Sequence, residues 1–213
     1  MKKLTFALCA LFASHLAFAS DAHAPVTKPV GNAAAGKTKA ATCAACHGAD
    51  GNSVVPDFPK IAGQHASYAF SQLKDFKSGA RKNPSMSPMA APLTEQDMLD
   101  LAAYFSSQTI KLGKADEALA AKGEVIYRAG IIEKGVPACT ACHSPQGNGN
   151  PASVYPRVGG QHAAYLEKQL QDYKNGVRAA DATTGNKLMM KQISAKLSPE
   201  EIKAVSAYIS GLH

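Results

Sequence analysis

Apolar residues follow two patterns along the chain: one continuous run near the start and helical spacing further on. Residues 4–18 are apolar with three polar exceptions, and two lysines precede them. A basic start, a short apolar run and a small-x-small site are typical of a secretory signal, and the run is too short to span a membrane. We therefore predict a signal peptide over residues 1–24, cleaved after Ala19 or after Ala24, and export of the protein. An uncleaved N-terminal anchor is the alternative.

The rest of the chain has the period of amphipathic helices and no convincing strand alternation. The predicted helices cover residues 33–43, 64–77 and 117–129. Two more are predicted to begin at Thr94 and Ser198, whose hydroxyls act as N-caps, with Asp97 and Pro199 as supporting signals. On the helix after Thr94, apolar residues share one side: Met98, Leu101, Ala102 and Phe105. Glycine- and proline-rich loops are expected at 48–59 and 144–156. The expected fold class is all-α.

The chain contains the same unit twice. Gly-Gln-His-Ala-Ser-Tyr at 63–68 recurs as Gly-Gln-His-Ala-Ala-Tyr at 160–165, and Leu-Ala-Ala-Tyr at 101–104 recurs as Val-Ser-Ala-Tyr at 205–208. About 190 residues without the signal suit two domains of roughly 90. We therefore predict two tandem domains, 25–112 and 113–213, joined near residues 110–116.

Each unit carries the same five-residue motif near its start. It reads Cys-Ala-Ala-Cys-His at 43–47 and Cys-Thr-Ala-Cys-His at 139–143. The pattern C-x-x-C-H is typical of c-type haem attachment, in which two thiols bond covalently to the haem and the histidine is an axial iron ligand. We predict two covalent haem c groups, and the residues that hold them are Cys43, Cys46, His47, Cys139, Cys142 and His143.

Two other chemistries use cysteines at this spacing. A disulfide across C-x-x-C is the thioredoxin-like arrangement, but that motif follows a strand, and here the flanks are alanine-rich and helical. Zinc accepts Cys and His ligands, but a zinc site would give no role to Met86 and Met190, two methionines at equivalent places in the two units.

A haem with one histidine ligand needs a ligand on its other face. Met86 and Met190 each lie seven residues before the leucine that heads the last helix of their unit. We predict that these two methionines, in loops before that helix, are the second iron ligands. Their neighbours Met89 and Met189 have no methionine partner in the other unit, and Met89 is the main rival for the first haem. Met with His raises the reduction potential, and two filled axial positions favour electron transfer over catalysis.

Several other repeated residues are candidates for supporting roles. His65 and His162 keep bis-histidine ligation open, although their place after Gly-Gln at a helix start favours a surface or supporting role. A proline carbonyl, from Pro59 or Pro156, could accept the free ring N–H of each ligand histidine. The basic candidates for contact with haem propionates are Lys60, Arg81, Arg157 and Arg178. Tyr104 and Tyr208 are expected in the core.

The charge of the chain indicates little by itself. The formal net charge is +7, and cleavage after Ala19 would remove two lysines and lower it to +5. Four haem propionates would offset most of this, and the basic residues are scattered, so we expect no nucleic-acid binding. An acidic redox partner or an anionic membrane surface is compatible with this charge.

The motifs together resemble the cytochrome c4 family of two-domain, dihaem class I c-type cytochromes. The resemblance is carried by CAACHGADGN at 43–52, FPKIAGQ at 58–64, CTACHSP at 139–145, YPRVGGQH at 155–162 and the ending YISGLH, and it spans nearly the whole mature chain. It implies two cytochrome c-like domains related by a pseudo-twofold axis, with His47 and Met86 on one haem and His143 and Met190 on the other.

The resemblance also implies a role. Such a protein is a periplasmic electron carrier, not an enzyme, between the quinol–cytochrome c reductase level and a terminal oxidase, and it is often loosely associated with the inner membrane. Two alternatives stay open: the haem subunit of a periplasmic dehydrogenase complex, and a dihaem peroxidase, which needs an open or displaceable iron ligand.

Overall fold

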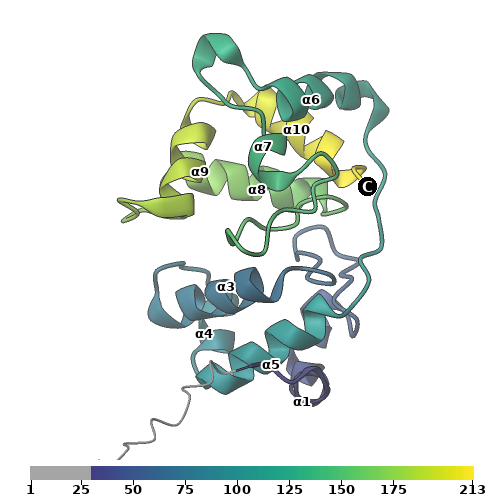
Figure 1. The fold of residues 1–213 in the computed structure, drawn as a ribbon, viewed down its shortest axis with the longest axis vertical. Helices are drawn as coiled ribbons and strands as arrows, with labels where there is room; N and C mark the ends of the chain where they lie inside the picture. Colours follow the sequence, from purple (N-terminus) through teal and green to yellow (C-terminus); the bar gives the residue numbers. More distant parts are fainter. Residues whose placement is uncertain (1–29) are drawn as a thin grey trace, which may run out of the picture.

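The computed structural model describes residues 30–213, and the predicted signal peptide with its cleavage site lies outside them. Within the described part every regular element is helical, apart from isolated β-bridges between Ile131 and Val136 and between Asn150 and Tyr155. The all-α prediction is therefore confirmed. Figure 1 shows two halves stacked along the long axis of the molecule, which we call the N-terminal half (30–112) and the C-terminal half (113–213).

The N-terminal half is built around its last helix. Its elements are α1 (Ala33–Lys39), η1 (Ala40–Thr42), α2 (Ala44–His47), α3 (Ala66–Ser78), α4 (Met86–Ala90) and α5 (Glu95–Ser106). Thr94 and Asp97 form a capping box, in which each side chain accepts from the other residue's backbone N–H. Helix α5 buries the four predicted residues, Met98, Leu101, Ala102 and Phe105, and α1 and α3 pack against it.

The C-terminal half repeats this plan. Its elements are α6 (Glu117–Ala129), η2 (Ile132–Lys134), α7 (Thr140–His143), α8 (Ala163–Lys174), α9 (Gly185–Ala195) and α10 (Pro199–Ser210). Ser198 caps α10 in a capping box with Glu201, and Pro199 occupies the first turn. Helices α6 and α8 pack against α10, so the last helix is again the centre of the core.

One glycine in each half lets two helices cross closely. A Cβ atom on Gly36 of α1 would lie 2.0 Å from the carbonyl oxygen of Asp100 in α5. A Cβ atom on Gly123 of α6 would lie 2.1 Å from the carbonyl oxygen of Ala204 in α10. Real side chains do not approach backbone this closely, so the crossing depends on glycine at both positions.

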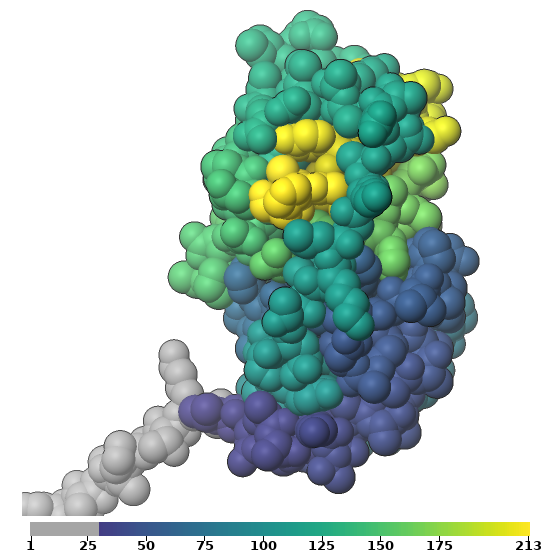
Figure 2. Space-filling model, turned by 90° about the vertical axis from the view of Figure 1, so that its right-hand side faces the viewer, coloured from purple at the N-terminus to yellow at the C-terminus, as the bar shows by residue number. Residues whose placement is uncertain are grey.

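The two halves are joined by residues 109–116, which contain no helix. Figure 2 shows this teal segment running over the surface from one half to the other. It lies where the sequence predicts the join, and the domain limits at residues 112 and 113 stay a prediction.

The halves meet through reciprocal hydrogen bonds. The side chain of Gln161 accepts from the N–H of Lys60 at 2.9 Å and donates to the Lys60 carbonyl at 2.7 Å. The side chain of Gln64 does the same to Arg157, at 2.9 Å for both bonds. Each contact is thus made twice, once from each half by equivalent residues. Such a repetition is typical of a twofold interface. This arrangement agrees with the predicted pseudo-twofold relation.

Candidate haem sites

Each C-x-x-C-H motif forms a short helix with its cysteines close to the histidine. In the N-terminal half Cys43 directly precedes α2, which contains Cys46 and ends at His47, and α7 repeats this in the C-terminal half. Positions three and four residues apart lie side by side on a helix. None of the cysteines in the described residues forms a disulfide, and burial raises the pKa of Cys139 to about 11. A raised pKa lowers the thiolate fraction of Cys139, which makes it a poorer redox nucleophile.

Both motif histidines are held by a proline carbonyl. Nδ1 of His47 donates to the oxygen of Pro59 at 2.9 Å, and Nδ1 of His143 donates to the oxygen of Pro156 at 3.0 Å. The predicted contact with the prolines is therefore confirmed. A carbonyl can only accept, so Nδ1 carries the hydrogen and Nε2 keeps a free lone pair. Burial lowers the pKa of both imidazoles, more than the carbonyls raise it, and this favours the neutral, metal-binding form.

The predicted methionine ligands lie in helices, not in loops. Met86 begins the short helix α4, and Met190 lies in the middle of α9. The loop expectation was wrong: Pro88 and Gly185, residue types that often interrupt helices, lie here in the first turn of a helix. Pro88 is only the third residue of α4, where a backbone N–H has no partner within the helix anyway, and Gly185 is the first residue of α9.

The methionines differ in exposure. Met86 and Met190 are half-buried. Met89 and Met189, in the same helices, are 44% and 39% exposed.

The rival histidines bridge the two halves. Nε2 of His65 donates to the carbonyl of Asn148 at 2.6 Å, and Nε2 of His162 donates to the carbonyl of Ser53 at 2.8 Å. Each acceptor belongs to the other half. Because a donating Nε2 has no free lone pair, these contacts favour a supporting role for both histidines.

The basic residues at the predicted propionate positions also lie at the interface. Arg81 donates to Tyr165 and Gln169 of the other half at 3.1 and 2.5 Å. Arg178 donates to Tyr68 and Gln72 of the other half at 2.7 and 2.9 Å. Each guanidinium also stacks on an aromatic ring of its own half, 4.6 Å from the Phe76 centroid and 4.5 Å from the Tyr173 centroid.

Lys60 and Arg157 directly follow the prolines that hold the histidines. Nζ of Lys60 donates to the carbonyls of Lys111 and Gly160. Nε of Arg157 is buried and has no hydrogen-bond partner among the described residues, and burial lowers its pKa. Arg157 thus has a buried, positively charged donor without a partner in the described part of the chain, and it directly follows Pro156, whose carbonyl holds His143. Such a donor suits an anionic group such as a haem propionate.

The donor set as a whole fits a covalently attached haem. Each half offers two thiols at the required spacing and one imidazole with a free Nε2. In the described residues there is no group of three His, Cys, Asp or Glu side chains that could hold a metal ion. Tyr104 and Tyr208 pack against the cores of their halves, as expected.

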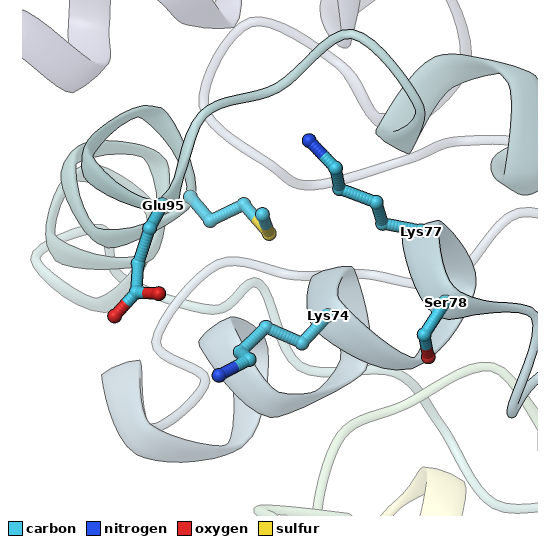
Figure 3. Close-up of a pocket in the computed structure, with 5 residues that line it drawn as sticks. Lys74, Lys77, Ser78 and Glu95 are labelled. Carbon is cyan, nitrogen blue, oxygen red and sulfur yellow. The ribbon is translucent and has the colours of Figure 1, made fainter.

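A surface pocket lies away from these residues. It has a volume of about 440 Å³ and is lined by Lys74, Lys77 and Ser78 of α3 and by Glu95 and Met98 of α5 (Figure 3). No predicted haem-attachment or iron ligand lines it, so we assign it no part in the haem sites. Within residues 30–213 no helix has the length and apolar character needed to cross a membrane.

Sequence reasoning did not identify the residues that join the halves: Gln64, Tyr68, Gln72, Gln161, Tyr165 and Gln169. All six repeat between the two units, at 64, 68 and 72 and again at 161, 165 and 169. The sequence did contain a signal for them, because each of these polar residues stands at the same place in both copies of the unit.

Comparison with known proteins identifies the family. The cytochrome c family model matches residues 33–109 and 120–213. Cytochrome c4 of Pseudomonas aeruginosa is 50% identical over 183 residues, which cover 86% of this chain and 90% of that protein. The crystal structure of reduced recombinant cytochrome c4 from Pseudomonas stutzeri has a TM-score of 0.82 and 49% identity, and the match covers 86% of this chain and 100% of that one. A thiosulfate dehydrogenase electron acceptor of Stutzerimonas stutzeri is 35% identical, covering 96% of this chain and 92% of that protein.

The chain therefore belongs to the cytochrome c family and, within it, to the cytochromes c4. It is a dihaem electron-transfer protein and not an enzyme. Its two C-x-x-C-H motifs carry two covalently bound haem c groups.

Proposed function

We propose that His47 and Met86 bind the iron of the first haem, and that His143 and Met190 bind the iron of the second. The hydrogen bonds from Nδ1 to the carbonyls of Pro59 and Pro156 carry this proposal, because they leave Nε2 free and fix the plane of each ring. The half-buried positions of Met86 and Met190 support the choice of sulfur ligands over their more exposed neighbours.

This ligand set suits electron transfer. When bound, each haem supplies an iron that changes between the ferric and ferrous states. The protein fills both axial positions, keeps the imidazole neutral by burial, and raises the reduction potential through the methionine sulfur. No position is then left for a substrate, so the peroxidase alternative requires displacement of a methionine.

We further propose that the protein works in the periplasm, takes electrons at the level of the quinol–cytochrome c reductase and passes them to a terminal oxidase. The predicted signal peptide and the family support this proposal. Loose association with the inner membrane is compatible with the net positive charge, since anionic lipids attract basic surfaces.

A second candidate role is electron acceptor for a dehydrogenase. It rests on the thiosulfate dehydrogenase electron acceptor that matches over nearly the whole chain. Stopped-flow mixing of the oxidised protein with a quinol–cytochrome c reductase or with a thiosulfate dehydrogenase tests the two roles. We expect faster reduction by the reductase. Faster reduction by the dehydrogenase would favour the second role.

The ligands are tested by a redox-titrated optical spectrum that includes the weak near-infrared band of sulfur-to-iron ligation. We expect Met86→Ala and Met190→Ala each to remove this band from one haem, and Met89→Ala and Met189→Ala to leave both bands in place. If Met89→Ala alone removed the band from the first haem, the assignment of Met86 would be wrong. Rapid binding of cyanide by the resting ferric protein would contradict the proposal that both axial positions of each iron are filled.

A further inference from the structure

Among residues 30–213, one ion pair crosses the interface between the halves, and it has no counterpart at the equivalent places. Nζ of Lys187 on α9 lies 2.6 Å from Oδ1 of Asp75 on α3, and these side chains are 43% and 14% exposed. Helix α9 carries Met190 in the C-terminal half, whereas α3 belongs to the N-terminal half. Figure 1 shows α3 and α8 in the two halves facing each other, with α9 and α4 beside them.

The equivalent places in the other half are occupied differently. Counted back from the leucine that heads each last helix, Lys187 corresponds to Asn83 just as Met190 corresponds to Met86. Asn83 stays within its own half, where its side chain accepts from the N–H groups of Ser85 and Met86 at 2.9 and 2.8 Å. Asp172, the counterpart of Asp75, pairs with Lys168 of its own helix at 2.8 Å.

The two methionine-bearing helices are therefore held by different means. Helix α4 packs on α3 of its own half, and Asn83 caps it by a local contact. Helix α9 packs on α8 of its own half and is tied to the other half by Lys187. Lys187 and Met190 are three residues apart in α9, so they lie on neighbouring positions of one helix face.

We propose that Lys187 and Asp75 are positioning residues for the sulfur ligand of the second haem. Through this pair the N-terminal half holds the helix that presents Met190. Among the described residues, the C-terminal half forms no equivalent ion pair with α4, which presents Met86. Movement at the interface would then weaken the support of Met190 as a sulfur ligand and leave that of Met86 unchanged. The inference rests on the proposed ligation by Met190.

The test measures how easily imidazole displaces each methionine in the ferric holoprotein. The haem that loses its near-infrared band in Met190→Ala identifies the second site. We expect Lys187→Gln and Asp75→Ala each to speed imidazole binding at that haem by about two- to fivefold, because a partly exposed ion pair contributes modestly and packing on α8 remains. The first haem should be unaffected.

Three further variants make the result specific. The exchange Asp75→Lys with Lys187→Asp rebuilds the pair and should restore the original rate. Lys168→Gln removes a cation from an ion pair within α8 and should change neither haem. Potentials give a second readout: a purely electrostatic effect lowers the potential in Lys187→Gln and raises it in Asp75→Ala, whereas a loosened sulfur ligand lowers it in both variants.

Changes of opposite sign, equal changes at both haems, or unchanged imidazole rates would each overturn the inference. If instead Met190→Ala kept both near-infrared bands, the ligand assignment itself would fail. The two failures are therefore distinguishable in one set of variants.

Discussion

Removal of the Gln161 side chain should destabilise the molecule and loosen the support of a haem ligand in the opposite half. Gln161 binds both the N–H and the C=O of Lys60, and both bonds are buried. Lys60 directly follows Pro59, whose carbonyl holds His47. Gln161→Ala therefore leaves two buried backbone groups without partners.

The expected loss of stability follows from the number of buried backbone groups that lose a hydrogen-bond partner. A buried donor or acceptor that loses its partner costs about 1–3 kcal/mol, so for two such groups we expect Gln161→Ala to lower the free energy of unfolding by about 2–6 kcal/mol. The equivalent bonds of Gln64 to Arg157 are only partly buried, and water can replace them. Gln64→Ala should therefore cost less than Gln161→Ala.

The assay is guanidinium unfolding of the ferric holoprotein, followed by circular dichroism and by the near-infrared band. Gln171→Ala is the control, because this amide binds only Glu167 within α8 and its loss should change stability by less than about 0.5 kcal/mol. The double variant Gln64→Ala with Gln161→Ala should cost less than the sum of the single variants, since both act on one interface.

The reasoning is refuted if Gln161→Ala resembles Gln171→Ala. It is equally refuted if Gln64→Ala is the more damaging substitution, because burial would then not decide the cost.

Three further substitutions test other parts of the structure. Ser194→Ala should raise the free energy of unfolding by about 1 kcal/mol, and with it the melting temperature measured by calorimetry. The buried Ser194 hydroxyl has no partner among the described residues, and Ala90 stands at the equivalent place in the other half. Gly123→Ala should destabilise by about 3 kcal/mol or more in a denaturant titration, because its Cβ would lie 2.1 Å from a carbonyl oxygen of α10. The hydrogen bond from Lys39 lowers the pKa of Asp100 to about 2, so its stabilising effect is present above about pH 4 and is lost as the pH falls towards 2. Acid unfolding curves of the wild type and Asp100→Asn should therefore converge at low pH.

Local signals predicted much of the structure. The capping residues Thr94 and Ser198 lie where the sequence placed them, because an N-cap depends on residues close in the chain. The C-x-x-C-H motifs and the proline carbonyls could also be predicted, since repetition in both halves restricts their role. These features require little knowledge of how distant segments meet.

Contacts between the halves could not be predicted in the same way. Gln64 and Gln161 were visible as repeated residues, yet nothing local shows that a glutamine brackets a backbone segment far away in the sequence. Helix α9 was missed because Gly185 and the polar residues before it resemble a loop, while its packing on α8 is a tertiary contact. Tertiary packing overrides weak local propensity in such short segments.

The interface contacts differ in how far they reach the two haems. Gln161 supports the segment that holds His47, and Gln64 supports the segment that holds His143, so each proximal histidine depends on the opposite half. Of the two helices that carry the proposed sulfur ligands, only α9 forms an ion pair with the opposite half in the described residues, through Lys187. The second haem is thus connected to the interface on both faces and the first haem on one. In the double variant Gln64→Ala with Gln161→Ala, imidazole should therefore displace the methionine of the second haem at a lower concentration than that of the first. Equal concentrations would show that the interface supports both sulfur ligands alike.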